Sequence, residues 1–243
     1  MSRTISLLSI IVPAYNEAST IEAIIGKILA VPFQVPYEIV IVDDFSTDGT
    51  YEIAQAIQKK NGSERIKIFK NSLNCGKGFS IRQGMGLASG DALIIQDADF
   101  EYEPSDIPNL LEPMLNGGAM AVFGSRFSQK GWPDGMAFAN MVANRFLTSL
   151  TNLLFGCRLS DMETCYKLIR RDALKGIRLS TQRFDFEPEI TCKLVQQGVE
   201  IIERPIRYRG RTAGEGKKIK ARDFFIAIRV LFQNKFFSAR EHG

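Results

Sequence analysis

The stretch EIVIVDDFSTDGT, residues 38–50, runs from an apolar, β-branched segment directly into a polar loop. Similar apolar runs recur along the first half of the chain with helical patterns between them, at residues 5–12, 38–42, 66–69, 91–96 and 119–123. Near-continuous apolar strands joined by helical crossovers are typical of a parallel sheet that is covered on both faces. The pattern therefore predicts an α/β fold with a mostly parallel central sheet flanked by helices.

Polar side chains follow four of the five predicted strands, at residues 13–17, 43–49, 97–99 and 124–126. Ligands of parallel sheets bind at the carboxyl ends of the strands, which is where these residues fall. Asp97 and Asp99 stand at i and i+2, so their carboxylates point to the same side and repel each other unless a cation lies between them. A divalent cation held by one or two carboxylates keeps open positions that phosphate oxygens usually fill. Helix capping is the plainer alternative for Asn16, Glu17, Ser46 and Asp48.

Length and composition set the class of protein. With 243 residues the chain can bury a full core, and we expect a catalytic domain over residues 1–220 followed by a C-terminal amphipathic helix and tail over residues 221–243. The net charge of +4 is only mildly basic, and we expect no nucleic-acid partner. Four cysteines without CxxC spacing indicate reduced thiols. No apolar run reaches the roughly 18 residues of a membrane span, so we expect a cytoplasmic protein, peripheral on the cytoplasmic membrane face if it meets a membrane.

Missing motifs exclude several kinds of enzyme. The single histidine is His242, next to the last residue, which excludes imidazole catalysis and a histidine-ligated zinc site. Neither GxGxxG after the first strand nor GxxxxGK[ST] occurs. A dinucleotide-dependent dehydrogenase and a P-loop ATPase are therefore both disfavoured.

The chain resembles glycosyltransferase family 2, whose members have the GT-A fold. The resemblance rests on four segments, IVPAYNE (11–17), EIVIVDDFSTDGT (38–50), GKG (76–78) with ASGD (88–91), and DAD (97–99). In the second half, DMETCYK (161–167), FDFEPE (184–189) and RTAGEGKK (211–218) resemble dolichyl-phosphate mannose synthases and related polyprenyl-phosphate sugar transferases. The resemblance implies a GT-A type fold with a Rossmann-like nucleotide-binding half. It also implies that the DXD motif at residues 97–99 holds Mg²⁺ or Mn²⁺ against the diphosphate of a nucleotide-sugar.

By position, the resemblance also implies the residues of the site. Those that would bind the nucleotide-sugar are Pro13, Tyr15, Glu17, Val42, Asp44, Ala98, Arg211 and Lys217. The metal ligands would be Asp97, Asp99 and Glu101, the last standing where the family more often has Gln. Catalysis would rest on Asp97, Asp99 and Arg126. The acceptor side would contain Arg126, Asp161, Glu163 and Glu189.

The implied reaction is a metal-dependent, inverting transfer of a hexose from a donor of the GDP-mannose or UDP-glucose type to a polyprenyl or dolichyl phosphate. One alternative is a family 2 transferase that acts on a sugar or protein hydroxyl in glycan biosynthesis. A second alternative is a non-catalytic nucleotide-binding protein, against which the intact pair Asp97 and Asp99 argues. The lone Trp132 has no Gln-x-x-Arg-Trp setting, which disfavours polymer synthesis.

The acceptor class depends on whether a catalytic base is present. A hydroxyl acceptor needs a base within hydrogen-bond reach, and the carboxylates that could supply one are Asp161, Glu163, Asp185, Glu187 and Glu189. A phosphate monoester has its second pKa near 6 and arrives largely ionised, so it needs a cation to position it instead. We expect Arg126 to be that cation.

Residues 221–240 have helical character, with several phenylalanines and a narrow polar stripe. Two interpretations remain open for the wide apolar face. It could pack on the domain or on a second copy, or it could lie on an anionic bilayer surface with the help of neighbouring lysines.

Overall fold

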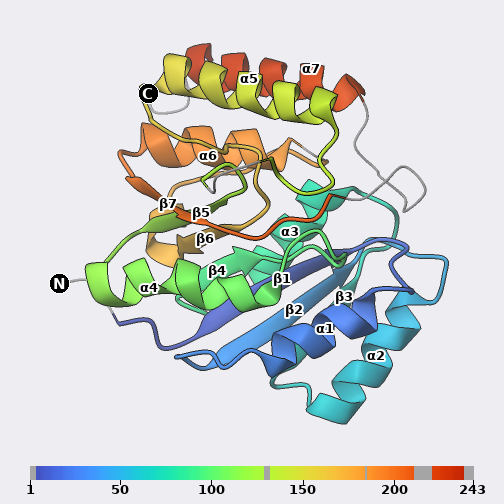
Figure 1. Cartoon of the computed structure of the whole chain (residues 1–243). Helices are drawn as coiled ribbons and strands as arrows, with labels where there is room; N and C mark the ends of the chain where they lie inside the picture. Colours follow the sequence, from blue (N-terminus) through green and yellow to red (C-terminus); the bar gives the residue numbers. More distant parts are fainter. Residues whose placement is uncertain (1–3, 129–131, 184, 211–220, 238–243) are drawn as a thin grey trace.

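The computed structural model describes residues 4–128, 132–183, 185–210 and 221–237. It contains a seven-stranded sheet in the order β3-β2-β1-β4-β6-β5-β7 (Figure 1). The strands are β1 (Leu8–Ala14), β2 (Tyr37–Asp43), β3 (Ile66–Lys70), β4 (Ala92–Ile95), β5 (Ala121–Ser125), β6 (Lys167–Arg170) and β7 (Ile201–Pro205). Neighbouring strands are parallel except at β6, which runs antiparallel to both β4 and β5. The predicted α/β fold with a mostly parallel sheet is confirmed.

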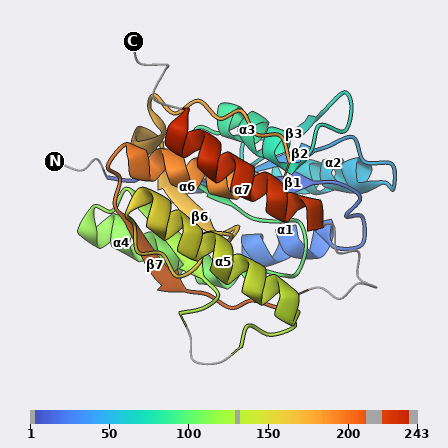
Figure 2. The same ribbon diagram turned by 90° about the horizontal axis from the view of Figure 1, so that it is seen from above.

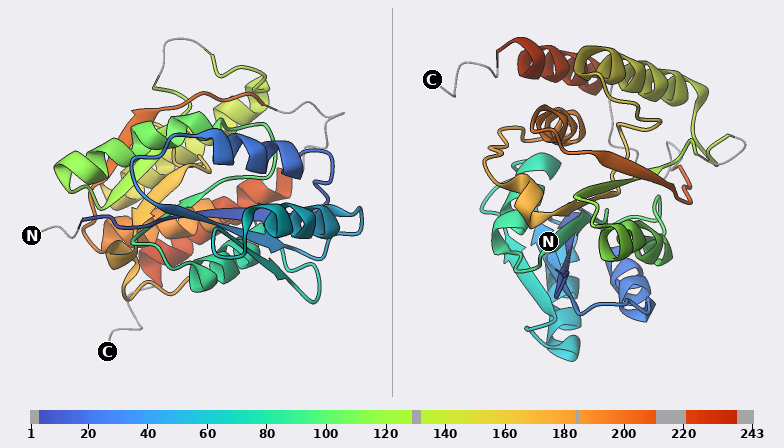
Figure 3. Two further views of the ribbon diagram at one scale, coloured as in Figure 1. Left: turned by 90° about the horizontal axis from the view of Figure 1, so that it is seen from below. Right: turned by 90° about the vertical axis from the view of Figure 1, so that its left-hand side faces the viewer.

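Helices cover the sheet on both faces. They are α1 (Ile21–Ala30), α2 (Thr50–Asn61), α3 (Lys77–Leu87), α4 (Ile107–Gly117), α5 (Phe138–Phe155), α6 (Phe186–Gln196) and α7 (Ala221–Phe236), with short 3-10 helices η1 (Pro104–Asp106) and η2 (Arg171–Leu174). Helices α5 and α7 lie side by side in a layer outside α6 (Figures 1 and 3). The helix predicted in the segment 221–240 is therefore present.

Strand β1 shows how the alternation of side chains builds two cores. Ile10 and Val12 are fully buried in the large cluster that includes the apolar face of α1. Ile11, between them, points to the opposite face. There α3 approaches so closely that a Cβ on Gly84 would lie 2.4 Å from Cγ2 of Ile11. Each buried isoleucine contributes about 1.5–3 kcal/mol.

The first strand is shifted from its predicted position. We expected residues 5–12, whereas β1 spans Leu8–Ala14 and so includes Pro13. Proline is normally excluded from central strands because it cannot donate a ladder hydrogen bond. Here β4 pairs with β1 only as far as Ile11, so β1 has β2 alone as its paired neighbour at Pro13. The end of the pairing between β1 and β4 explains why a proline is tolerated near the end of this strand.

Two further expectations concern the chain as a whole. All four cysteines are free thiols, as predicted. No helix among the described residues is both long and apolar enough to cross a bilayer. The division into residues 1–220 and 221–243 stays a prediction, although α7 packs closely on α5 and α6 through Ala227 and Leu231.

Candidate active site

The carboxyl ends of the parallel strands meet at one edge of the sheet. From β1, chain order runs to β2 and β3 on one side and to β4 on the other, so the order reverses between β1 and β4. Such switch points are where open α/β sheets bind ligands. Tyr15 follows β1 and Asp97 lies two residues after β4, on the two sides of this point. The topology thus brings the predicted nucleotide and metal residues to the same edge.

The loops after β1 and β2 are tied together by hydrogen bonds. The amide of Asn16 donates to Oγ of Ser46 at 3.0 Å, and the amide of Thr47 donates to Oδ1 of Asn16 at 3.0 Å. Asn16 and Phe45 have positive φ angles, 52° and 62°. A non-glycine residue adopts this conformation only where its surroundings impose it, and such positions cluster at functional sites. Sequence reasoning did not identify this strained pair.

The nucleotide-side residues differ in how accessible they are. Tyr15 is exposed at the end of β1, whereas Glu17 is buried and accepts a hydrogen bond from Oγ1 of Thr20. The Val42 side chain is fully buried with the core that covers the α3 face of the sheet. Pro13, its register partner on β1, is also buried. Val42 could therefore contact a base only through its backbone.

Asp44 organises the loop that leads into α3. Its carboxylate accepts hydrogen bonds from the amides of Cys75 and Gly76, at 2.9 and 2.7 Å, and from Nδ2 of Asn71 at 2.8 Å. The neighbouring Asp43 is fully buried, and its Oδ1 has no hydrogen-bond partner among the described residues. Burying an unpaired oxygen costs about 1–3 kcal/mol, which a ligand donor would offset. We therefore add Asp43 to the candidate nucleoside contacts.

A lysine occupies the position next to Asp97 where we expected a metal ion to balance the charge. Nζ of Lys77 lies 2.9 Å from Oδ1 of Asp97 and 3.2 Å from Oε1 of Glu187 on α6. Burial by itself lowers the pKa of Lys77, but the Asp97 carboxylate raises it well above its ordinary value. Gly76, at φ 95°, permits this arrangement, because a Cβ there would lie 2.5 Å from the backbone oxygen of Gln182. Sequence reasoning missed the bridging role of Lys77.

The three predicted metal ligands do not form a three-carboxylate cluster. No group of three or more metal-ligating side chains capable of holding an ion occurs within the described part of the chain. Asp99 is buried beside Ala98, and its Oδ1 accepts the amide hydrogen of Glu101 at 2.9 Å. The carboxylate of Glu101 instead accepts a long hydrogen bond from the hydroxyl of Tyr208 at 3.4 Å. The role of Glu101 as a third ligand therefore stays a prediction, and Asp97 and Asp99 are the pair on which the site is argued.

Arg126 is engaged by Asp161. Its Nε and Nη2 donate to the two carboxylate oxygens of Asp161 at 2.7 Å each, and its amide donates to Oδ2 at 3.0 Å. Both side chains are buried, and the Arg126 guanidinium also lies 5.2 Å from the ring centre of Tyr208. Asp161 thus neutralises most of the charge that we expected to receive an acceptor phosphate. The role of Arg126 at the acceptor stays a prediction.

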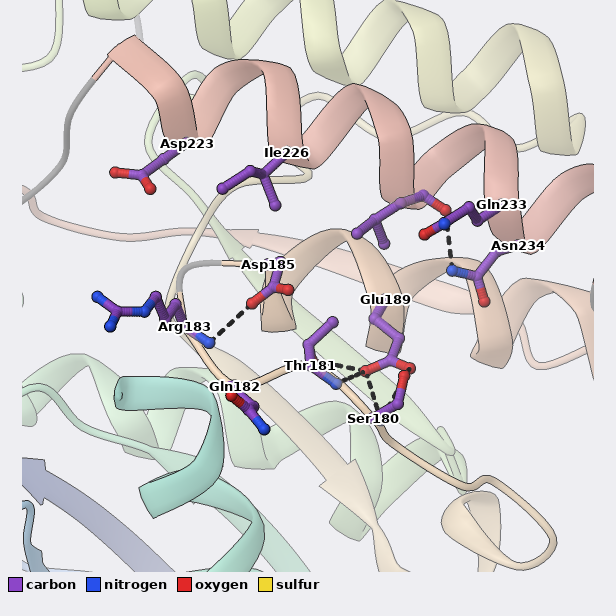
Figure 4. A pocket seen from close by; sticks show the side chains of 11 residues that line it. Ser180, Thr181, Gln182, Arg183, Asp185, Glu189, Asp223, Ile226, Gln233 and Asn234 are labelled. Carbon is purple, nitrogen blue, oxygen red and sulfur yellow. Dashed lines mark hydrogen bonds between the residues drawn. The ribbon is translucent and has the colours of Figure 1, made fainter. Parts of the chain in front are cut away.

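Glu189, which we expected on the acceptor side, stabilises the segment before α6. Its carboxylate accepts hydrogen bonds from the amides and hydroxyls of Ser180 and Thr181 (Figure 4). It also lies 2.8 Å from Nζ of Lys193. It thereby anchors the segment before α6 beside a pocket of about 350 Å³ that α7 closes on the other side (Figure 4). These contacts give Glu189 a structural role, and its role at the acceptor stays a prediction.

The half-buried Glu163 and the fully buried Lys167 both have shifted pKa values. Burial, and next the neighbouring Glu187 carboxylate, raise the pKa of Glu163 to about 8. Burial lowers the pKa of Lys167 to about 8, although Glu187 and Asp161 oppose that shift. Oε1 of Glu163 is buried without a hydrogen-bond partner in the described structure. The two remaining predicted residues, Arg211 and Lys217, lie outside the described residues.

Comparisons with known proteins identify the family and the fold. Residues 9–178 match the model of the family described as glycosyl transferase family 2. The chain is 28% identical over 234 residues to the dolichol-phosphate mannosyltransferase of Pyrococcus furiosus, an alignment that covers 93% of this chain and 63% of that protein. It is 27% identical over 214 residues to the polyprenol monophosphomannose synthase of Mycolicibacterium smegmatis, covering 86% and 79%. The chain thus spans less than two thirds of the length of the Pyrococcus protein.

Solved structures show the same fold. Glucosyl-3-phosphoglycerate synthase from Mycobacterium tuberculosis, in complex with Mn²⁺, uridine-diphosphate and glucosyl-3-phosphoglycerate, superposes with a TM-score of 0.72 at 20% identity and covers 95% of this chain and 80% of that one. Mannosyl-3-phosphoglycerate synthase from Rubrobacter xylanophilus gives a TM-score of 0.71 at 20% identity, covering 98% and 76%. The GT-A type fold is confirmed. With most of its length matched by the family model, the chain belongs to glycosyl transferase family 2.

Proposed function

We propose that this chain transfers a hexose, with inversion, from a nucleotide diphosphate-sugar to a polyprenyl phosphate. The observation that carries the proposal is the position of Asp97 and Asp99 at the switch point between β1 and β4, in a family 2 fold. The names of two relatives, a dolichol-phosphate mannosyltransferase and a polyprenol monophosphomannose synthase, support the lipid phosphate acceptor. A donor of the GDP-mannose or UDP-glucose type fits the proposal.

The donor would lie across the loops after β1 and β2. Tyr15, which is exposed, could stack on the base, and Asp43 could accept a hydrogen bond from the nucleoside through its unpaired Oδ1. Lys77 lies beside Asp97, where the diphosphate would arrive, and provides a positive charge at that point. The departing nucleoside diphosphate accumulates negative charge, which preorganised cations at this edge would stabilise.

A divalent cation fits Asp97 and Asp99 on the chemistry of the donors. Mg²⁺ in proteins is usually bound by one or two carboxylates together with substrate phosphates, so two carboxylates without a third are sufficient. The Mycobacterium tuberculosis structures contain Mn²⁺ or Mg²⁺, which agrees with this proposal. The cation would supply charge stabilisation at the diphosphate. Lys77 would have to share Asp97 with it.

The experiment is a panel of labelled GDP- and UDP-sugars, each incubated with a short-chain prenyl phosphate and Mn²⁺ or Mg²⁺. Label that moves into organic solvent with one donor supports the proposal. Label that appears only in a water-soluble glycan or protein would favour a hydroxyl acceptor. Calorimetric binding of a nucleotide diphosphate without any transfer would favour a non-catalytic nucleotide-binding protein.

We further propose that the outer face of α5 and α7 rests on an anionic bilayer on the cytoplasmic side. On α5, Phe138, Val142 and Phe146 are exposed at i, i+4 and i+8, so they share one face. On α7, Phe225 and Phe236 are exposed in the same way. Cations are interspersed on the two helices, at Arg145, Arg222, Arg229 and Lys235. Figure 2 shows the two helices side by side on this surface. Apolar side chains mixed with cations suit an anionic lipid surface.

Co-sedimentation with vesicles tests this second proposal. We expect the chain to bind vesicles rich in phosphatidylglycerol and to bind pure phosphatidylcholine weakly. The double variant Phe225→Gln and Phe236→Gln should lose most of this binding, whereas Leu87→Gln on α3, which is also exposed, should keep it. Equal vesicle binding by both variants, or dimerisation of the wild type through this face in solution, would contradict the proposal.

A further inference from the structure

A cluster of ionisable side chains lies at the candidate site, where β4 and β5 end and β6 begins. It contains three cations and four carboxylates, namely Lys77, Arg126, Lys167, Asp97, Asp161, Glu163 and Glu187. If every member were ionised, the cluster would hold one unbalanced negative charge. An unbalanced charge in a buried region is costly, so one carboxylate is expected to retain its proton.

The contacts identify which carboxylate that is. Lys77 is shared between Asp97 and Glu187, and Arg126 holds Asp161 through two hydrogen bonds of 2.7 Å. The third cation, Lys167, donates to the backbone oxygen of Met162 at 2.7 Å, and its Nζ lies 3.9 Å from the ring centre of Phe123. Glu163 alone among the four carboxylates has a buried oxygen without a partner in the described structure.

Glu163 also lies at the correct edge of the sheet. Because β6 is antiparallel to β4 and β5, the residues that precede Lys167 lie beside those that follow β4 and β5. The carbonyl of Tyr166 accepts the amide hydrogen of Gly124 on β5 at 2.8 Å, which fixes this segment in place. Glu163, three residues before Tyr166, is half-buried, so a ligand at this edge could reach it.

We infer that Glu163 is a specificity-determining residue that stands as a neutral carboxylic acid and donates a hydrogen bond to a phosphate oxygen of the acceptor. This inference rests on the proposed function and deepens it. An ionised phosphate oxygen only accepts hydrogen bonds, and a carboxylate cannot donate one, whereas a carboxylic acid can. The acid form therefore favours an anionic acceptor over a neutral hydroxyl.

The surroundings of Glu163 support the acid form and set its pH range. The charged groups that act on it are Glu187 of α6, Lys167 of β6, Arg126 after β5 and Asp161 of its own loop. Burial, then Glu187, raise its pKa to about 8, so the acid form predominates at neutral pH. Above that pH the ionised carboxylate would repel a phosphate dianion, and acceptor binding should weaken by up to about tenfold for each further pH unit.

The test compares the wild type with Glu163→Gln and with Glu22→Gln, an exposed control on α1. KM for a short-chain prenyl phosphate and kcat are measured from about pH 6.5 to about pH 9.5, at saturating donor and metal. We expect the wild-type KM to rise steeply above about pH 8 and Glu22→Gln to follow it. The amide of Glu163→Gln is a weaker donor, so its KM should be several-fold higher at pH 7. The amide does not titrate, so the KM of the Glu163→Gln variant should fall below the wild-type KM at high pH.

Infrared spectroscopy gives a readout that needs no variant to fold. The wild type should show a carboxylic acid C=O band at pH 7 that titrates near pH 8. Absence of that band would overturn the inference. A Glu163→Gln variant that loses turnover 100-fold or more at an unchanged KM would overturn it as well, because that is the effect of removing a general base. If prenyl phosphate is glycosylated but the two KM profiles run parallel, the inference alone fails. If no sugar enters prenyl phosphate at any pH, the proposed function fails, and the inference with it.

Discussion

The carboxylates after β1 and β2 and those around β5 and β6 are stabilised in different ways. Asp44 and Asp48 accept hydrogen bonds from backbone amides of neighbouring loops. Asp161 faces the buried guanidinium of Arg126, and one oxygen of Glu163 faces no partner in the described structure. The proposed nucleotide side is therefore held by the main chain, whereas the proposed acceptor side depends on a balance of buried side-chain charges. Substitutions should expose this difference.

The largest effect is expected for Arg126→Ala. Removing one partner of a buried ion pair leaves Asp161 charged and unpaired, which should lower the free energy of unfolding by about 3–5 kcal/mol. The exposed pair of Lys175 and Asp172 serves as the control, and Lys175→Ala should cost less than about 0.5 kcal/mol. Urea denaturation measures both. Arg126→Ala should also raise KM for prenyl phosphate. If both the free energy of unfolding and KM changed only slightly, the proposed acceptor side would not differ from the proposed nucleotide side in this way.

The next effect is expected for Asp99→Asn, which keeps an oxygen able to accept the Glu101 amide hydrogen. Loss of the carboxylate should lower turnover by about 10²–10³-fold and weaken metal-dependent nucleotide binding, because charge stabilisation at the diphosphate is lost. Calorimetry with Mn²⁺ and a nucleotide diphosphate checks the binding. The thermal midpoint should barely change. Near-normal activity of this variant with the metal chelated would refute the metal interpretation.

Asp44→Asn tests the side held by the main chain. The variant loses charge-assisted hydrogen bonds to the amides of Cys75 and Gly76, and we expect a loss of about 1–3 kcal/mol in the free energy of unfolding. Because those bonds shape the loop that carries Lys77, affinity for the nucleotide donor should fall as well. Denaturation and donor titration measure the two effects. A stable variant with unchanged donor affinity would show that the loop does not depend on Asp44.

The smallest effect concerns Glu189 and acid pH. Burial raises the pKa of its carboxyl, but hydrogen bonds from Lys193, Thr181 and Ser180 outweigh burial and lower it below the ordinary value of 4.5. Since the native state holds the ionised form more tightly, its contribution is complete above pH 4.5 and is lost as the pH falls through the lowered native pKa. We expect Glu189→Gln to cost about 1 kcal/mol at pH 7 and to lose less stability than the wild type on acidification, as measured by thermal melting. Identical acid profiles would contradict this role.

Part of the fold followed directly from local sequence pattern. The apolar runs predicted five strands close to their observed positions, because alternation and β-branching report whether a strand is buried on both faces. The antiparallel insertion of β6 between β4 and β5 was not predicted. This strand has four residues, of which only Leu168 and Ile169 are apolar, and so short a pattern carries no information about which strands will flank it. Likewise, the end of β1 depended on where β4 stops pairing with it.

The candidate site, like the fold, was predicted only in part from the sequence. Asp97 and Asp99 were found from their spacing and their place after a strand, and the topology brings them to the switch point as expected. Glu189 was placed on the acceptor side, yet it anchors Ser180 and Thr181. In the amino-acid sequence, a glutamate that binds a backbone turn cannot be distinguished from one that binds a ligand. The contacts that distinguish the two cannot be read from residue type.

The sequence by itself determined the α/β class and the polar residues that follow the strands, because these depend on residue type and on short periodic spacing. The tertiary structure decided which charges meet. Lys77 reaches Asp97 across 20 residues and Arg126 reaches Asp161 across 35, while one oxygen of Glu163 has no partner among the described residues. Whether a carboxyl is ionised depends on its burial and on the charges within a few ångströms of it. Those neighbours come from distant segments, and only folding brings them together.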